Sequence, residues 1–228
     1  MDKANPGAQR LARPRARRPA QRRSVQSAAL GFLIFTLGGQ AFGVTSAIVP
    51  AEQSIAGASQ GEWAMRWWQW AFSFDQVRSP IADRTGERCA SRQEGDVWFL
   101  AGTYGSRRVE RTCTIPFGKT LFFPLINYVA FRGDGSQENC MSLASRAAAL
   151  TNDLSALVLE IDGTRYDNLK VHRQASACFS VVPGQKPDSV SNGYYIAIRP
   201  LSRGRHTLNF GGVLPNLAQA VTYTIVVE

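Results

Sequence analysis

Residues 157–163 read LVLEIDG, and this stretch decides the fold class because the hydrophobic period of the chain changes there from helix to strand. Its leucines and isoleucine alternate with Val158 and Glu160, which is typical of a strand with one buried face. Asp162-Gly163 then forms a two-residue hairpin turn, in which both central residues adopt positive φ. The stretch therefore predicts a strand that turns back into an antiparallel sheet.

Other short apolar runs extend this pattern in both directions along the chain. Pro124 lies within one of them and predicts an edge or a bulge there. Strands are expected at residues 97–100, 112–115, 120–126, 170–172, 178–182, 194–199, 206–210 and 221–227. Short strands separated by turn residues favour a mainly-β fold, a β-sandwich of immunoglobulin-like or jelly-roll type.

Two helices are expected beside the strands, on one face or at one end of the sandwich. The first covers residues 61–74 and is rich in tryptophan, and Ser59 with Glu62 predicts a capping box at its start. Its apolar face carries Trp63, Trp67, Trp70 and Phe74. A second, middle helix covers residues 141–154, again with one apolar face.

The N-terminal region differs in charge from the rest of the chain. Residues 1–23 hold eight Lys and Arg against one Asp, so they carry seven of the nine net positive charges of the protein. Residues 24–51 hold no charged residue, and their apolar centre is AALGFLIFTL at 28–37. A basic segment, an apolar segment and then small residues follow the order of a signal peptide. The basic charge belongs to this leader, so it does not predict nucleic-acid binding.

Cleavage after Gly43 would divide the chain into a leader at residues 1–43, a lead-in at 44–60 and one β-rich domain at 61–228. The alternative is an uncleaved anchor, because the uncharged stretch is long enough to cross a bilayer. Contact with a membrane is expected only through that leader. Either reading places the domain outside the cytoplasm, in the periplasm or secreted.

Four cysteines, Cys89, Cys113, Cys140 and Cys178, all follow the leader. An even number in an exported chain predicts two disulfides. We favour the pairs Cys89–Cys113 and Cys140–Cys178, because each closes a compact local unit. No Cys-x-x-Cys spacing is present, so no metal site is expected, and no motif predicts a cofactor.

Several phrases resemble those of a family of exported bacterial proteins. They are WWQWA at 67–71, VWFLAG at 97–102, CTIP with GK at 113–119 and LFFPLIN at 121–127. The resemblance implies export. It carries over no activity and no catalytic residue.

Two groups of residues are candidates for a functional site. Three carboxylates between the first helix and the first strand, Asp75, Asp83 and Asp96, could include an acid and a base for a hydrolase acting on an envelope polymer. Arginines are interleaved with them, so the same loop could hold only solvated ion pairs. The second group is aromatic: Trp68 lies off the apolar face of the first helix, and Trp98 and Tyr104 follow later. Exposed rings of this kind can bind a glycan or another protein.

Three short motifs have ordinary structural explanations. The GASQG sequence at 57–61 fits the nucleophile elbow of hydrolases, but no preceding strands supply the sheet which that fold needs. GKT at 118–120 lacks the first glycine of a P-loop, and RGD at 132–134 is a tripeptide that occurs by chance. His206 is expected to be packed and hydrogen-bonded, and His172 to face solvent. We therefore expect a non-enzymatic binding or structural domain of the bacterial envelope, with the hydrolase as the alternative.

Overall fold

The computed structural model describes residues 46–105, 108–133 and 135–228. The predicted leader and its cleavage site lie outside the described residues. Among the described residues, no helix combines the length and the apolar character needed to span a bilayer.

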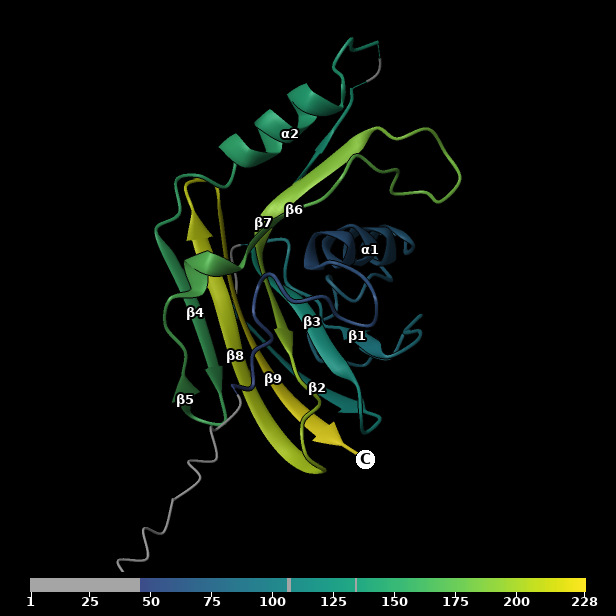
Figure 1. The fold of residues 1–228 in the computed structure, drawn as a ribbon. Coiled ribbons are helices and arrows are strands. Elements are labelled where there is room, and N and C mark those ends of the chain that lie inside the picture. Colours follow the sequence, from purple (N-terminus) through teal and green to yellow (C-terminus); the bar gives the residue numbers. More distant parts are fainter. Residues whose placement is uncertain (1–45, 106–107, 134) are drawn as a thin grey trace, which may run out of the picture. The chain divides into compact units, whose positions relative to one another are not determined.

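Two mixed β-sheets pack face to face, which confirms the predicted mainly-β sandwich (Figure 1). The first sheet has the order β1 (Val97–Phe99), β3 (Thr120–Phe131), β7 (Ser189–Ile198) and β6 (Arg173–Ala175). The second has the order β2 (Arg108–Ile115), β9 (Leu217–Val227), β8 (Gly204–Leu214), β4 (Ala156–Ile161) and β5 (Thr164–Arg165). One edge pair in each sheet is parallel, β1 with β3 and β2 with β9, and the other pairs are antiparallel.

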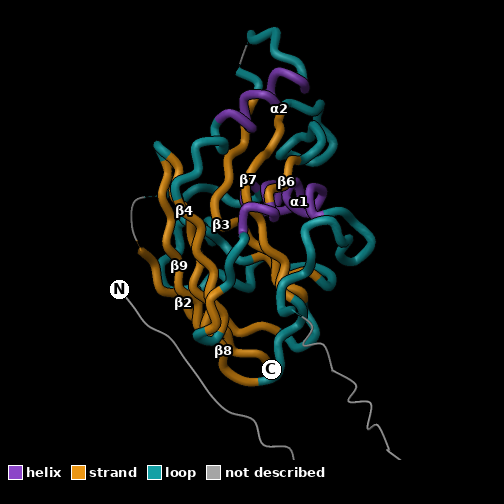
Figure 2. The backbone as a smooth tube through the Cα atoms, turned by 60° about the vertical axis from the view of Figure 1, so that its left-hand side comes forward, coloured by secondary structure: helices purple, strands orange, loops and turns teal. Residues whose placement is uncertain are grey.

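Both helices, α1 (Gln60–Phe72) and α2 (Cys140–Ala149), pack against β3 and β7 of the first sheet. Helix α1 lies on the side away from the second sheet, whereas α2 lies on the opposite face, beyond the ends of the strands of the second sheet (Figure 1 and Figure 2). Strand β7 is consequently buried on both faces, with Tyr195 towards α1 and Ile196 towards the second sheet. Strand β9 is covered on one side only and shows the alternating burial that its sequence predicts.

The ends of the helices follow their capping residues. The Ser59 hydroxyl accepts a hydrogen bond from the backbone N–H of Glu62 at 3.2 Å, as predicted. The reciprocal half of that capping box is absent, because the Glu62 carboxylate pairs with Arg66 at 2.8 Å instead. A complete capping box starts α2, where the Asn139 side chain accepts from two backbone N–H groups and Ser142 reaches back to Asn139.

Two predicted strands were wrong. Residues 170–172 belong to a 3₁₀ turn, Leu169–His172, because Asn168 adopts a left-handed conformation (φ 56°) and redirects the chain. Residues 178–182 form a loop in which Phe179 alone bridges to Ser189. The Pro124 prediction was right: the register of β3 against β7 shifts between Pro124 and Ile126 as a bulge. The hairpin turn is also confirmed, since Asp162 and Gly163 both have positive φ.

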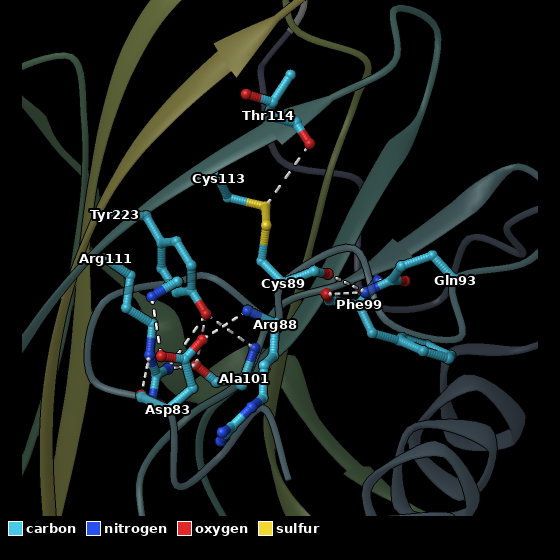
Figure 3. Close-up of a disulfide and its surroundings, with 11 residues drawn as sticks. Asp83, Arg88, Cys89, Gln93, Phe99, Ala101, Arg111, Cys113, Thr114 and Tyr223 are labelled. Atoms are coloured by element: carbon cyan, nitrogen blue, oxygen red, sulfur yellow. Dashed lines mark hydrogen bonds between the residues drawn. A yellow bond between two sulfur atoms is a disulfide. The ribbon is translucent and has the colours of Figure 1, made fainter. Parts of the chain in front are cut away.

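Both predicted disulfides are confirmed. Cys89–Cys113, with 5.8 Å between its Cα atoms, joins the loop at residues 75–96 to β2 (Figure 3). Cys140–Cys178, at 5.6 Å, joins the start of α2 to the loop after β6. The first bond lies in the core, whereas Cys140 is exposed.

The segment at residues 46–60 is an integral part of the domain and not only a lead-in. Ile48 bridges to Ile198 at the end of β7, and the backbone N–H of Val49 donates to the carbonyl of Ala197 at 2.9 Å. The side chain of Gln60 donates to the carbonyl of Pro50 at 2.6 Å. These contacts hold the segment beside the start of α1.

Candidate binding surface

The Asp83 carboxylate is bound into its own loop. It accepts hydrogen bonds from the backbone N–H groups of Thr85 (2.9 Å), Gly86 (3.1 Å) and Arg88 (2.8 Å). Burial opposes ionisation of Asp83, but these donors outweigh it and hold the pKa of the carboxyl below its usual value. A carboxylate whose oxygens are already occupied by backbone donors organises the loop and is a poor proton donor.

The other two candidate carboxylates are exposed. Asp75 forms an ion pair with Arg78 three residues later, and donors on Arg78 lower the pKa of the Asp75 carboxyl. Asp96 precedes β1, and its backbone carbonyl accepts from the N–H of Thr120 at 3.0 Å. Among the described residues, none of the three has another carboxylate as a hydrogen-bond partner. The loop provides ion pairs and backbone contacts.

Arg111 of β2 fixes the position of this loop and is only 3% exposed. Its guanidinium donates to the carbonyls of Asp83 (2.7 Å), Ile81 (3.1 Å) and Ala101 (2.6 Å). It also donates to the carbonyl of Gly102 and the hydroxyl of Tyr223, so five acceptors surround one cation. Figure 3 shows Arg111 with Asp83, Ala101 and Tyr223. The segments before and after β1 are thereby tied to the second sheet.

Trp68 is held in place from beneath by a buried tyrosine. Its indole Nε1–H donates to the hydroxyl of Tyr195 at 3.0 Å, and the side-chain amide of Asn127 donates to the same oxygen at 2.9 Å. Burial raises the pKa of Tyr195 to about 12, so the hydroxyl stays neutral at physiological pH. Trp68 is therefore a fixed, half-buried ring on α1.

Trp68 and Tyr104, two of the three predicted ligand-binding residues, line one depression of about 260 Å³. Phe72 and Phe74 line it as well, and we call these four residues the aromatic surface. Tyr104 is 57% exposed and Phe72 is 45% exposed, values that are high for rings of this size. Trp98 is not part of this surface, because it lies in the core between the sheets with 7% exposure.

A larger depression of about 790 Å³ begins at Phe72 and continues along the other side of α1. It is bounded by the loop that holds Val182, which is 48% exposed. Its remaining lining includes Trp63, Trp70, Phe99, Arg66 and Arg92. The ring of Phe131 also packs edge-on against Phe72, with centroids 5.3 Å apart. The surface around the C-terminal end of α1 therefore contains both apolar rings and arginines.

The sequence pattern did not identify Phe72 and Phe74 as surface residues. The helical stripe predicted Phe74 to lie with Trp70, and although α1 ends at Phe72, the half-buried Phe74 ring does pack edge-on against Trp70 at 5.9 Å while its other part lines the depression. Phe72 is the last residue of α1 and lies beside Trp68 in space, with the two rings stacked at 5.6 Å. One sequence feature could have identified Phe72 as an exposed neighbour of Trp68. Phe72 lies four residues after Trp68 and, like it, off the apolar stripe of the helix.

His206 lies in an arrangement that resembles a Ser-His-Asp triad. Its Nδ1 is 2.7 Å from Asp162 Oδ2, and its Nε2 is 3.3 Å from the Ser202 hydroxyl. Nε2 is closer, at 2.9 Å, to the carbonyl oxygen of Ser202. Because a carboxylate and a carbonyl only accept hydrogen bonds, both ring nitrogens must donate, and the ring is held as imidazolium. A ring without a free lone pair cannot activate the hydroxyl.

Electrostatics agree with this assignment of His206. Partial burial lowers the pKa of the imidazole, but the hydrogen bonds to Asp162 and to the Ser202 carbonyl raise it above its ordinary value of 6.5.

His172, predicted to face solvent, is buried, and this burial lowers its pKa. Among residues 46–105, 108–133 and 135–228, no group of three or more His, Cys, Asp or Glu could hold a metal ion.

Comparisons with known proteins show only distant likenesses. No family model matches the chain, and no curated protein matches it. The structure of PbICP-C in complex with falcipain-2 is similar to 59% of this chain and all of that chain, at 11% identity and a TM-score of 0.26. The solution structure of amebosin is similar to 53% of this chain and 96% of that chain, at 13% identity and a TM-score of 0.24. Similarities of this size give no information about function.

Proposed function

We propose that this protein is an exported, non-enzymatic binding domain of the bacterial envelope, and that it binds its ligand through the aromatic surface. The observation that carries the proposal is the exposure of Phe72 and Tyr104 beside Trp68 on a rigid support. Exposed rings that adjoin one another mark binding sites more often than scattered ones do. Two disulfides, Cys89–Cys113 and Cys140–Cys178, support a location in an oxidising compartment.

The rigidity of the support favours binding over a purely structural role. Tyr195 fixes Trp68 from below, and the Arg111 network fixes the segments around Ile81 and Ala101. A surface whose side chains are already ordered loses little conformational entropy when a ligand binds. The same network orders the carboxylate-rich loop, which gives that loop a supporting role.

Native mass spectrometry of the protein recovered from the periplasm of an expressing bacterium tests the proposal. The wild-type domain should retain an adduct of defined mass. The double variant Phe72→Ser/Tyr104→Ser should lose it. Val213→Ser is the matched control, because Val213 is an exposed apolar residue of β8 on the second sheet. An adduct that survives in the double variant, or one that Val213→Ser also removes, would contradict the proposal.

A further inference from the structure

Four arginines line depressions near the end of α1. Arg66 and Arg92 line the depression of about 790 Å³, and Arg78, Arg88 and Arg92 line a third one of about 420 Å³ beside Phe74. Two of them are neutralised within the domain, since Arg66 pairs with Glu62 and Arg78 with Asp75. The other two donate only to backbone carbonyls, Arg88 to Val77 at 2.9 Å and Arg92 to Ser73.

Arg88 and Arg92 therefore keep an uncompensated charge beside the aromatic surface. In the described part of the chain, no carboxylate lies within ion-pair distance of either guanidinium. The acidic residues that line the same depressions are Asp75, which is already paired, and Glu94. Positive charge beside exposed rings is complementary to a ligand with both acidic and apolar groups.

The arrangement of the rings distinguishes between a glycan and a polypeptide. A sugar ring stacks on the open flat face of an aromatic side chain. Here one face of Trp63 is covered by Arg66 at 4.5 Å, and one face of Phe74 is covered by Arg92 at 4.7 Å. Trp68 stacks on Phe72, and its indole N–H points inward to a hydroxyl. These four rings therefore each have one face covered within the domain, and the grooves between them suit the side chains of a polypeptide better than the flat ring of a sugar.

We infer that the aromatic surface binds an acidic polypeptide segment that carries aromatic or large aliphatic side chains. The apolar side chains of the segment occupy the depressions around Phe72, and its carboxylates pair with Arg88 and Arg92. Guanidinium groups suit this role because they bind carboxylates in a planar, two-point geometry. The inference rests on the proposed function and specifies the class of the ligand.

Three soluble polymers with carboxylate groups test the inference. They are a random copolymer of glutamate and tyrosine, poly-glutamate, and polygalacturonate, which carries its carboxylates on a sugar chain. Fluorescence anisotropy of the labelled polymers gives their affinity for the full domain. The copolymer should bind most tightly, poly-glutamate more weakly, and polygalacturonate least.

The variant Arg88→Gln/Arg92→Gln should weaken copolymer binding about tenfold, since each exposed charge pair contributes up to about fivefold. Arg205→Gln is the matched control, because Arg205 is an exposed arginine on β8. It should leave the affinity within about twofold. Circular dichroism checks that both variants are folded. The difference between wild type and double variant should shrink as salt is raised.

Each other outcome overturns the inference in a distinguishable way. Equal or tighter binding of polygalacturonate would identify a glycan ligand and leave the proposed binding function intact. Copolymer binding that is unchanged in the double variant would remove the role of the arginines. Absence of binding by all three polymers would reject an acidic ligand, and the periplasmic adduct experiment would then judge the binding function independently.

Discussion

Replacing Arg111 by alanine should destabilise the domain strongly, because one buried cation holds five acceptors from three parts of the chain. The substitution removes the donor of the Ile81, Asp83 and Gly102 carbonyls, whereas the Ala101 backbone and the Tyr223 hydroxyl keep their contacts with each other at 3.3 Å. A buried acceptor that loses its partner costs about 1–3 kcal/mol, but water entering the space compensates in part. Hydrogen bonds to a charged group contribute about 1.5–3 kcal/mol each, so the loss of several, partly compensated by water, amounts to about 3–5 kcal/mol.

We therefore expect a loss of about 4 kcal/mol in the free energy of unfolding, a large part of the stability of an ordinary domain. Urea unfolding followed by tryptophan fluorescence measures this loss. Arg108→Gln is the matched control, since Arg108 lies on the same strand with its side chain exposed. It should change stability by less than about 0.5 kcal/mol. If Arg111→Ala costs less than about 1 kcal/mol, the Arg111 network does not hold the loop as described.

Three further predictions concern pH and redox conditions. His206→Gln should lower the free energy of unfolding below pH 6.5 and have little effect at alkaline pH, because the raised pKa of His206 stabilises the folded state only until pH rises through that value; parallel stability curves from acid to alkaline pH would disagree. His172 has a lowered pKa, so its contribution to stability should fall as pH drops below 6.5, and His172→Leu should lose less stability on acidification than the wild type does. A variant with the wild-type acid dependence would contradict it. Dithiothreitol should reduce Cys140–Cys178 before Cys89–Cys113, because Cys140 is exposed; mass mapping of alkylated cysteines would reveal any other order.

The elements that could be predicted well are those whose sequence pattern follows from a single local requirement, such as burial of one face or a positive φ. Strand β9 alternates because only one of its faces is buried, and Asp162-Gly163 turns because both residues tolerate positive φ. Pro124 has no N–H to donate, so a bulge beside it was foreseeable. The disulfide pairs followed from the compactness of the units that they close.

Other features depend on contacts between distant parts of the chain and left no local pattern. The 3₁₀ turn Leu169–His172 contains a valine and a histidine, whose sequence resembles a strand, and the reversal comes from the left-handed Asn168 before it. Strand β6 is three residues long and is defined only by its pairing with β7. Trp98 was expected to be exposed because it lies on the opposite face from its strand neighbours, but both Val97 and Trp98 of β1 are buried.

The candidate surface was predictable in its composition and not in its geometry. Trp68 stood out because it lies off the apolar stripe, and Tyr104 because it is one of many large rings in a short stretch of sequence. Their proximity depends on the sandwich, on the Tyr195 hydroxyl beneath Trp68 and on the Arg111 contacts behind Ala101. The buried role of Asp83 was equally hidden, since its partners are backbone groups of its own loop.

The most direct test of the central claim is photo-crosslinking in living cells, with p-benzoylphenylalanine placed at Tyr104 or, as the control, at Val213. Both positions are exposed, so the two proteins should react alike with random neighbours. If the aromatic surface binds an envelope ligand, the Tyr104 position gives a discrete adduct that the Val213 position does not give. If the two positions give the same products, or Tyr104 gives none, the aromatic surface is not the binding site.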